Sequence, residues 1–472
     1  MNRRRLLAGL LLAAAIAAVL PQAALAHGLV GREDLPIPKW LFGWSATAVL
    51  VVSFVALAVL WPRPRLEAPA ERRLLRVPKL LDPICGVTGV AIFGLLVYAG
   101  FAGSQTATNN LTPTFVFVIF WVAVAVLSAL FGDVFKAFNP WRAVVRAAAA
   151  IASRVRHGEL PAPMPYPPLL GRWPAAAAIL VFAWVELVYS GRNDPSHLAL
   201  LALAYAAIQL IGMRLYGIET WNRYGDGFGV YFGLYARISP LRWERGAVYG
   251  RVPLRGLTTL EPVPGTVALL CTMIGTTSFD GFSAGPTWGA IWPRMVDSLR
   301  TIGFSQSTSL EIAYSIGLIV VVVVVAALYE IGVRGMRTAS HVKLSSDALA
   351  ARFAHTLVPI ALAYVIAHYF SLLAYQGQAM AYLASDPLGN GADIFGTAGS
   401  TIDYTWISAN MIWYVQVGAL VLGHVGGLIL AHDRALVTFD EGRSATRSQY
   451  WMLAVMIAFT SLGLWLLSAA NS

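Results

Sequence analysis

Polar and ionisable side chains recur at helical spacing inside the long apolar segments of this chain. The clearest series is Tyr364, His368, Ser371 and Tyr375, whose members are four, three and four residues apart. This spacing places them on one face of a helix. An ionisable group among apolar helices costs several kcal/mol unless it faces a polar interior, so His368 is a candidate for chemistry.

Other apolar segments supply groups that could act with His368. Asp280 closes a Thr-Thr-Ser-Phe-Asp run, Glu186 lies in the outer half of its segment, and Tyr414 lies near the start of another. A histidine and a carboxylate can exchange or stabilise a proton, and a tyrosine can donate to a developing oxyanion. The sequence therefore predicts a catalytic group of His368, Asp280, Tyr375 and Tyr414.

A metal site is a second interpretation of the same outer groups. The residue expected after signal cleavage is His27, whose free α-amine and imidazole can chelate one ion, an arrangement suited to copper or zinc. His27, His368 and Asp280 would then be the ligands of a divalent metal that activates a water. The simpler alternative for His368 is an interhelical hydrogen bond worth about 1 kcal/mol.

Four further histidines are expected nearer the inner side of the membrane or within helix packing. His424 stands beside Gly423, which favours close packing of two helices around one satisfied imidazole. His355 and His432 lie at the inner boundary of apolar segments, where we expect solvated side chains. His157 falls in a polar loop and has no predicted role.

The composition excludes a soluble enzyme. Of the 472 residues, 57% are hydrophobic and 12% charged, whereas soluble domains are about 45–50% apolar and about 25% charged. Apolar runs of around twenty residues, enough to cross about 30 Å of hydrocarbon, recur along the chain. The prediction is an all-α, polytopic transmembrane helical bundle. The two cysteines make neither a disulfide framework nor a Cys-x-x-Cys motif.

The first 26 residues are predicted to be a cleavable signal peptide. A basic start at Arg3–Arg5 precedes an apolar stretch and an Ala24-Leu25-Ala26 cleavage site. Residues 27–472 would then form a single transmembrane domain. Length, hydropathy and flanking Pro or Gly predict ten spans, at 41–61, 83–103, 114–132, 173–190, 197–215, 264–280, 311–332, 354–375, 406–430 and 449–470.

The distribution of basic residues predicts which side each loop faces. With the mature N-terminus outside, cytoplasmic loops carry 26 Lys and Arg and outer segments only five, which follows the positive-inside rule. This indicates a multi-pass protein of the plasma (inner) membrane with both mature termini outside. The net charge of +10 then reflects sidedness and contact with membrane lipids, not a nucleic-acid partner. Two cytoplasmic stretches, near 140–157 and 219–238, mix arginines with apolar residues and are predicted to be interfacial helices.

Several stretches resemble the bacterial integral membrane proteins known as fenitrothion hydrolases. They are the mature start HGLVGREDLPIPKWLFGW and the segments FGDVFKAFNPWR, ETWNRYGDGFGVYFGLYARISPL, TSFDGF and ALAYVIAHYFSLL. The resemblance spans nearly the whole mature chain and implies hydrolysis of the P–O–aryl bond of a neutral organophosphorus triester, a small apolar substrate. It implies no particular catalytic residue.

Two other function classes remain open at this stage. A transporter or metal-handling permease would use the same stripe as a pathway continuing through Tyr364 to His424 and His355. A haem or copper electron-transfer bundle would use His368 and His424, but these are predicted to lie roughly 10 Å or more apart in depth at about 1.5 Å per residue. An enzyme pocket could instead end blind near His368.

Overall fold

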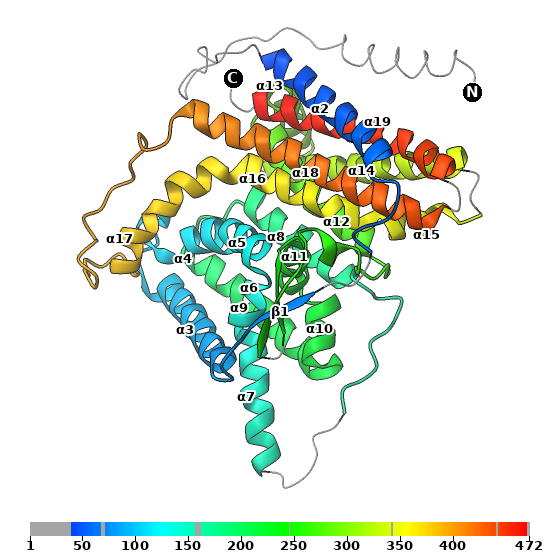
Figure 1. The fold of residues 1–472 in the computed structure, drawn as a ribbon. Coiled ribbons are helices and arrows are strands. Elements are labelled where there is room, and N and C mark those ends of the chain that lie inside the picture. Colours follow the sequence, from blue (N-terminus) through cyan, green and yellow to red (C-terminus); the bar gives the residue numbers. More distant parts are fainter. Residues whose placement is uncertain are drawn as a thin grey trace.

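The computed structural model describes residues 39–67, 71–155, 162–244, 246–340, 343–439 and 442–469. The predicted signal peptide and His27 lie outside these residues, as does His157. The described chain is mostly helical, as predicted (Figure 1). In chain order the longer helices are α2 (Lys39–Leu60), α3 (Leu81–Ala102), α7 (Pro140–Val155), α8 (Trp173–Leu187), α9 (Pro195–Tyr216), α12 (Thr266–Ser283), α13 (Pro286–Thr301), α14 (Gln306–Ser340), α16 (Leu357–Gln376), α18 (Ala409–Thr438) and α19 (Gly442–Ala469).

Shorter elements connect these helices. The segment 111–131 is one apolar unit whose centre is a π-helix, and the only sheet in the described residues has three strands in the order β1-β3-β2. The shorter elements are β1 (Arg72–Arg76), η1 (Ala107–Asn109), α4 (Leu111–Thr114), η2 (Phe115–Ala123), α5 (Val124–Phe131), α6 (Val134–Phe138), α10 (Ile218–Tyr224), α11 (Gly227–Ala236), β2 (Leu241–Glu244), β3 (Ala247–Gly250), η3 (Arg255–Leu257), α15 (Ser346–Phe353), η4 (Ala354–Thr356), η5 (Gly377–Ala379) and α17 (Met380–Ser385).

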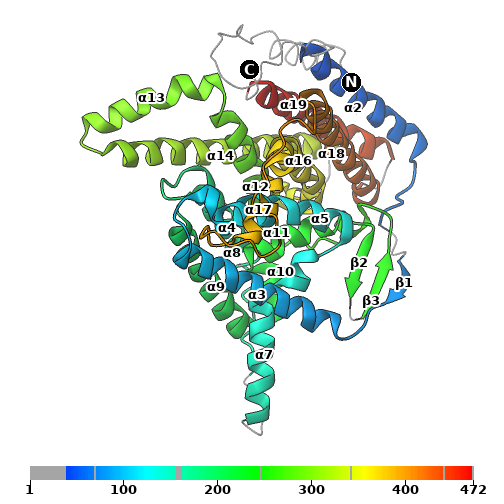
Figure 2. The same cartoon turned by 90° about the vertical axis from the view of Figure 1, so that its left-hand side faces the viewer.

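Each of the ten predicted segments contains a helix, but not every one is long enough to span a membrane. Among the described residues, six helices are long and apolar enough to cross, or seven if the bent pair α12–α13 counts as one. That pair turns by 87° between Ser283 and Pro286, so the outer loop predicted there is in fact a second helix. In Figure 2, α13 and α14 form a hairpin that projects from the body of the bundle.

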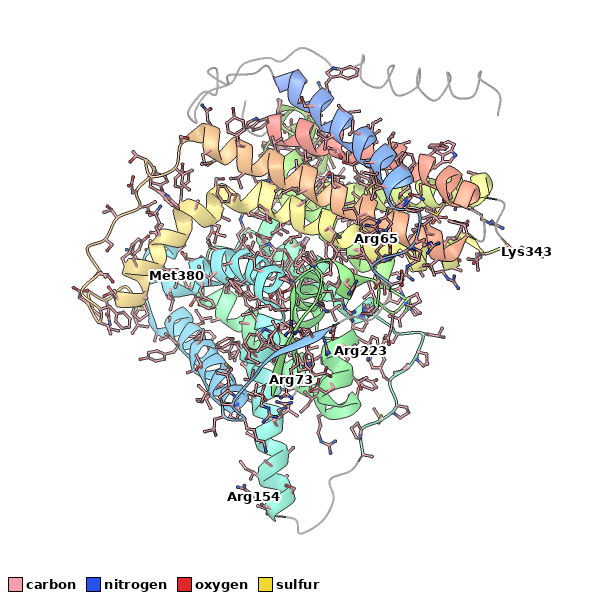
Figure 3. All side chains as sticks on the ribbon, in the orientation of Figure 1. Arg65, Arg73, Arg154, Arg223, Lys343 and Met380 are labelled. Carbon is pink, nitrogen blue, oxygen red and sulfur yellow. The ribbon has the colours of Figure 1, made fainter. Side chains whose placement is uncertain are left out.

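Two helices, α12 and α16, lie at the centre of the packing between helices. α12 contacts α8, α14 and α16, and α16 contacts α18, so α12 and α16 lie inside the bundle. Glycine permits the closest of these approaches: a Cβ on Gly423 of α18 would lie 2.2 Å from the Ala363 Cβ of α16. Met380 and Lys343 mark opposite edges of the molecule in Figure 3, consistent with opposite ends of the helices between them.

The stretch 219–238, predicted to be an interfacial helix, is divided into two helices. It breaks at Gly225 and Asp226 into α10 and α11, and α11 is largely buried, with Tyr231 and Phe232 at most 1% exposed. The carboxylate of Asp226 explains the break, because it accepts a hydrogen bond from the Gly229 amide and caps α11. By contrast, α7 extends away from the body in Figures 1 and 2 and carries exposed apolar residues.

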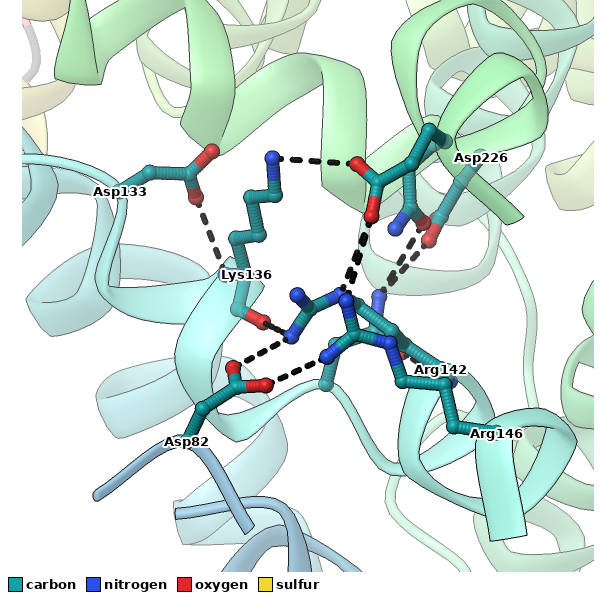
Figure 4. Close-up of polar contacts among 9 residues, drawn as sticks. Asp82, Asp133, Lys136, Arg142, Arg146 and Asp226 are labelled. Atoms are coloured by element: carbon teal, nitrogen blue, oxygen red, sulfur yellow. Dashed lines mark hydrogen bonds and ion pairs between the residues drawn. The ribbon is translucent and has the colours of Figure 1, made fainter. Parts of the chain in front are cut away.

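Asp226 also joins three other parts of the fold. Its oxygens accept hydrogen bonds from Trp141 Nε1 at 2.8 Å, Asn139 Nδ2 at 3.1 Å and the Tyr205 hydroxyl at 2.8 Å. Figure 4 shows this carboxylate beside the ion pairs of Arg142 and Arg146. A buried acceptor with this many donors fixes α6, α7 and α9 against the start of α11.

We expect Asp226→Asn to lower the free energy of unfolding by about 1–3 kcal/mol, because an amide leaves a buried donor without an acceptor. The measurement is thermal or denaturant unfolding of purified protein in detergent. The control is Asp297→Asn on the exposed surface of α13, which should change stability by less than about 0.5 kcal/mol. Equal stability of the two variants would contradict this role.

Candidate functional site

The predicted partners His368 and Asp280 lie side by side where α12 meets α16. His368 Nε2 is 2.8 Å from an oxygen of Asp280, a hydrogen-bonded ion pair when the imidazole is protonated. Both side chains are only partly covered, with 25% of His368 and 24% of Asp280 exposed. A histidine held by a carboxylate in this way is an oriented proton acceptor.

The imidazole presents its other nitrogen away from the carboxylate. Nδ1 of His368 makes no hydrogen bond to any residue that the structure describes. A cavity of about 30 Å³ adjoins the side chain, between α12, α16 and Gly463 of α19. A buried water needs roughly 10–15 Å³ of such space, so the cavity has room for a water beside His368.

Three other polar groups surround the pair. Tyr369 is close enough to act on both Asp280 and Glu186, and its ring meets the His368 ring edge-on at 4.7 Å between ring centroids. Arg192, in the turn between α8 and α9, is close enough to act electrostatically on both carboxylates. The site thus combines two carboxylates, one imidazole, one phenol and one guanidinium from α8, α12 and α16 and the turn after α8.

Aromatic side chains pack next to α16, the helix that carries His368. Trp121, in the π-helix η2, stacks on Tyr231 of α11 with ring centroids 4.5 Å apart and planes 13° apart. η2 also contacts α16, the helix that carries His368. π-helical turns are uncommon and occur frequently at functional sites, because the extra residue re-aims side chains.

The α12 hydroxyls predicted at the same depth are satisfied within their own helix. Thr276 and Ser278 donate hydrogen bonds to the carbonyls of Thr272 and Ile274, both at 4-residue spacing. These hydroxyls donate to backbone and not to the Asp280 carboxylate, which interacts with His368 and Tyr369. The Thr-Thr-Ser-Phe-Asp run therefore contributes Asp280 to the ion pair, while Thr277 and Ser278 line the cavity beside His368.

The two predicted tyrosine donors do not join the His368–Asp280 pair. The Tyr375 hydroxyl donates to the Ile407 carbonyl at 3.1 Å, and its ring packs against Tyr404. Tyr414 is 47% exposed on α18. The phenol at the pair is Tyr369, which is adjacent in sequence to His368 and was missed because the four-residue stripe drew attention to a neighbouring helix face.

The inner histidines are buried, contrary to the solvated positions predicted for two of them. His432 Nδ1 lies 2.9 Å from Gln449 Oε1 and its Nε2 lies 3.0 Å from the Trp61 carbonyl, so it ties α18 to α19 and to the end of α2. His355 is 2% exposed, with Nδ1 3.0 Å from the Arg352 carbonyl. These imidazoles have structural partners, because helix ends there fold back onto one another.

The transport pathway predicted beyond His368 runs through Tyr364 and His424, whose side chains are buried. The Tyr364 hydroxyl donates to the Phe459 carbonyl at 2.8 Å. His424 is fully buried, and its Nδ1 lies 2.7 Å from the Leu420 carbonyl. Tyr364 and His424 thus direct their hydrogen bonds to backbone, in the helix packing expected for His424.

The predicted metal set is only partly within the described chain. His368 and Asp280 are adjacent, whereas His27 lies outside the described residues. Among the described residues, no group of three or more His, Cys, Asp or Glu side chains is arranged to hold a metal ion. The imidazole of His368 and the carboxylate of Asp280 are suited to proton transfer.

Arg192 is the second group that the sequence did not single out. It is one of the few basic residues in the segments predicted to lie outside, and that prediction gave no reason to place it near Glu186 and Asp280. The signal that could have found it is its position only five residues after the polar end of α8. Its positive charge acts on both carboxylates, although among the described residues it forms no ion pair with either.

Comparison with known proteins identifies no relative. No family model, no curated protein and no solved structure matches this chain. These comparisons therefore do not bear on the resemblance to fenitrothion hydrolases. The functional assignment of the site depends on the His368–Asp280 pair and the residues around it.

Proposed function

We propose that the protein is a membrane-embedded hydrolase of neutral organophosphorus triesters such as fenitrothion. The observation that carries the proposal is the partly exposed His368–Asp280 pair beside a cavity with room for a water. The resemblance noted from the sequence supplies the substrate class. A neutral triester partitions into the bilayer and could reach this pair between helices.

In the proposed reaction, His368 Nδ1 accepts a proton from the water as its oxygen bonds to phosphorus. The P–O–aryl bond breaks, and the aryloxide leaves and takes up the proton from the imidazolium. Asp280 stabilises the imidazolium through Nε2, at 2.8 Å. The products are a phosphodiester acid and an aryl alcohol, so atoms and charge balance.

Arg192 and Tyr369 are suited to the charge that develops during this attack. As the phosphoryl group becomes more negative, a guanidinium and a phenol near the pair would stabilise it, an effect worth about 3 kcal/mol for one well-placed donor. Their positions follow from their interaction with Asp280 and Glu186. Both are positioning or electrostatic groups in this scheme.

The direct test is release of aryl alcohol from a neutral dialkyl nitrophenyl phosphotriester by purified protein in nanodiscs. Enzyme-dependent appearance of nitrophenol supports hydrolysis. A permease would instead carry the intact triester across a vesicle wall without releasing nitrophenol, and that result would replace the proposal. The hydrogen bond from the Tyr364 hydroxyl to the Phe459 carbonyl commits this side chain to helix packing, which favours an enzyme pocket over a transport pathway.

The proposed location is the inner membrane, with ten spans and both mature termini outside. Reporter fusions after Arg65, Arg255 and Arg447 should then report cytoplasm, because these loops carry most of the basic residues. Fusions after Gln105, Asp386 and the last residue should report the exterior. A cytoplasmic C-terminus would contradict the span count.

The proposed signal peptide makes a separate prediction. N-terminal sequencing of purified protein should begin at His27, since the Ala24-Leu25-Ala26 run suits signal peptidase. Elemental analysis of the same sample tests the metal interpretation. A chain that begins at Met1 would lack the chelating α-amine at His27 and would remove that ligand.

A further inference from the structure

A second, larger cavity lies among the loops predicted to face the cytoplasm. It has a volume of about 930 Å³ and is bordered by α6, α10, α11, β2 and the loop that follows β3. Seven Lys or Arg side chains and five Asp or Glu side chains line it. The hydrolytic pair His368–Asp280 is not among its lining residues, so this cavity needs its own explanation.

Most of the acidic side chains around the cavity are committed to other cations. Glu219 pairs with Lys136 at 3.2 Å and lies next to the Arg142 and Arg146 pairs drawn in Figure 4. Glu67 pairs with Arg434 at 2.9 Å. These carboxylates therefore do little to balance the remaining arginines.

The other acidic groups are similarly occupied. Glu71, just before β1, and Glu244, on the same strand as Arg242, both pair with Arg242. Burial raises the pKa of Asp133, whose oxygen accepts a hydrogen bond from the Lys136 amide at 3.0 Å. The glutamates around the cavity are therefore already paired with cations, and Asp133 is more readily protonated than a free aspartate.

Three arginines on the cavity wall point their donors at backbone instead of carboxylates. Arg172 donates to the Glu261 carbonyl at 2.9 Å, and Arg237 donates to the Gly256 carbonyl at 3.1 Å. Among the described residues, neither guanidinium lies within 4.0 Å of a carboxylate. Arg251 has a 7% exposed side chain and reaches a carboxylate only at 4.0 Å.

Arg172 is the most deeply buried of the three. It is 2% exposed, and its Nε has no hydrogen-bond partner among the described residues. Burial and the positive charge of Arg237 lower the pKa of Arg172 to about 10, and burial lowers the pKa of Arg251 to about 10. At neutral pH both remain protonated, so buried positive charge converges on one cavity with too little negative charge to balance it.

We propose that this cavity binds an anion with a phosphate or phosphoryl group. Guanidinium groups bind phosphate oxygens through paired hydrogen bonds, and three of them from separate loops could contact one such group. The volume is in the range of small-molecule sites and exceeds what a single inorganic ion fills. Two sources share this chemistry, the headgroup of an anionic inner-leaflet lipid and a free organic phosphate.

The test uses full-length protein purified in neutral detergent, with sodium pyrophosphate as the free probe and sodium chloride at equal ionic strength as the reference. A saturable rise in the unfolding temperature with pyrophosphate would indicate a free phosphate ligand. If pyrophosphate has no effect, nanodiscs of phosphatidylglycerol and phosphatidylcholine distinguish a lipid headgroup, with retained phosphatidylglycerol measured by native mass spectrometry.

Variants connect the binding to the cavity. Arg237→Gln should weaken the binding of the active probe at least tenfold, and Arg172→Gln should do the same. The control is Arg154→Gln, at the exposed tip of α7 and well separated from Arg223 of the cavity wall in Figure 3. If Arg172→Gln does not fold, Arg237→Gln and Arg237→Lys carry the test.

Two outcomes would overturn the proposal. One is an absence of both pyrophosphate stabilisation and selective phosphatidylglycerol retention in the unmodified protein. The other is binding that Arg237→Gln and Arg154→Gln leave equally strong, which would show a general charge effect. Hydrolysis of triesters is measured separately, so either failure is distinguishable from a failure of the proposed enzyme.

Discussion

His368→Ala is expected to reduce triester hydrolysis by about 10²–10⁴-fold in kcat, because it removes the proton acceptor for the attacking water. His368→Gln should be equally inactive: a glutamine amide can still donate to Asp280 but cannot take a proton from water. The measurement is nitrophenol release by purified variants at matched concentration. Loss in both variants separates the proton-transfer role from the hydrogen bond.

The matched control for this experiment is another histidine paired with an aspartate. His197 lies 3.2 Å from Asp194, but it is exposed at the start of α9, with half of its side chain accessible. His197→Ala should leave the rate within about twofold. If His368→Ala keeps the wild-type rate and only lowers the unfolding temperature, then the imidazole is an interhelical hydrogen bond and the proposed chemistry is wrong.

Asp280→Asn is expected to reduce kcat by about 10²-fold or more while changing the packing little. The amide has nearly the same shape as the carboxylate, but it cannot stabilise the imidazolium that forms when His368 takes the proton. The rate should be measured together with the unfolding temperature, since the variant also alters a partly buried ion pair.

A double variant tests whether the two residues act as one unit. Residues that act together give strongly non-additive effects, so Asp280→Asn combined with His368→Ala should be no slower than His368→Ala alone. Independent roles would instead multiply the two losses. Ser298→Ala, on the exposed surface of α13, provides a control with no expected effect on rate.

The long apolar helices and their order could be predicted from the sequence, because each is a run of apolar residues bounded by Pro, Gly or charge, whereas α13 lies in a predicted loop. Proximity of His368 and Asp280 could also be predicted, since the predicted topology places both toward the outer ends of their apolar segments. The other side chains around this pair could not be predicted. Tyr369 follows His368 directly and projects about 100° further round the helix, so only the packing of α8, α12 and α16 selects it.

The burial of the arginines around the larger cavity, in loops predicted to be cytoplasmic, could not be predicted from the sequence. The positive-inside rule alone accounts for so many basic residues in these loops, so their number gave no sign of a binding cavity. Their burial depends on contacts between residues far apart in the chain: β1 pairs with β3 across more than 170 residues, and Asp226 at the start of α11 accepts hydrogen bonds from Asn139 and Trp141. Such long-range pairing leaves no local pattern in the sequence.

The most direct test of the central claim is hydrolysis of a neutral nitrophenyl phosphotriester by purified protein in water enriched in oxygen-18. If His368 and Asp280 direct a water to phosphorus, the phosphodiester product carries one labelled oxygen, visible as an isotope shift by phosphorus-31 NMR, and nitrophenol carries none. Label in nitrophenol, or no enzyme-dependent product at all, would contradict the account.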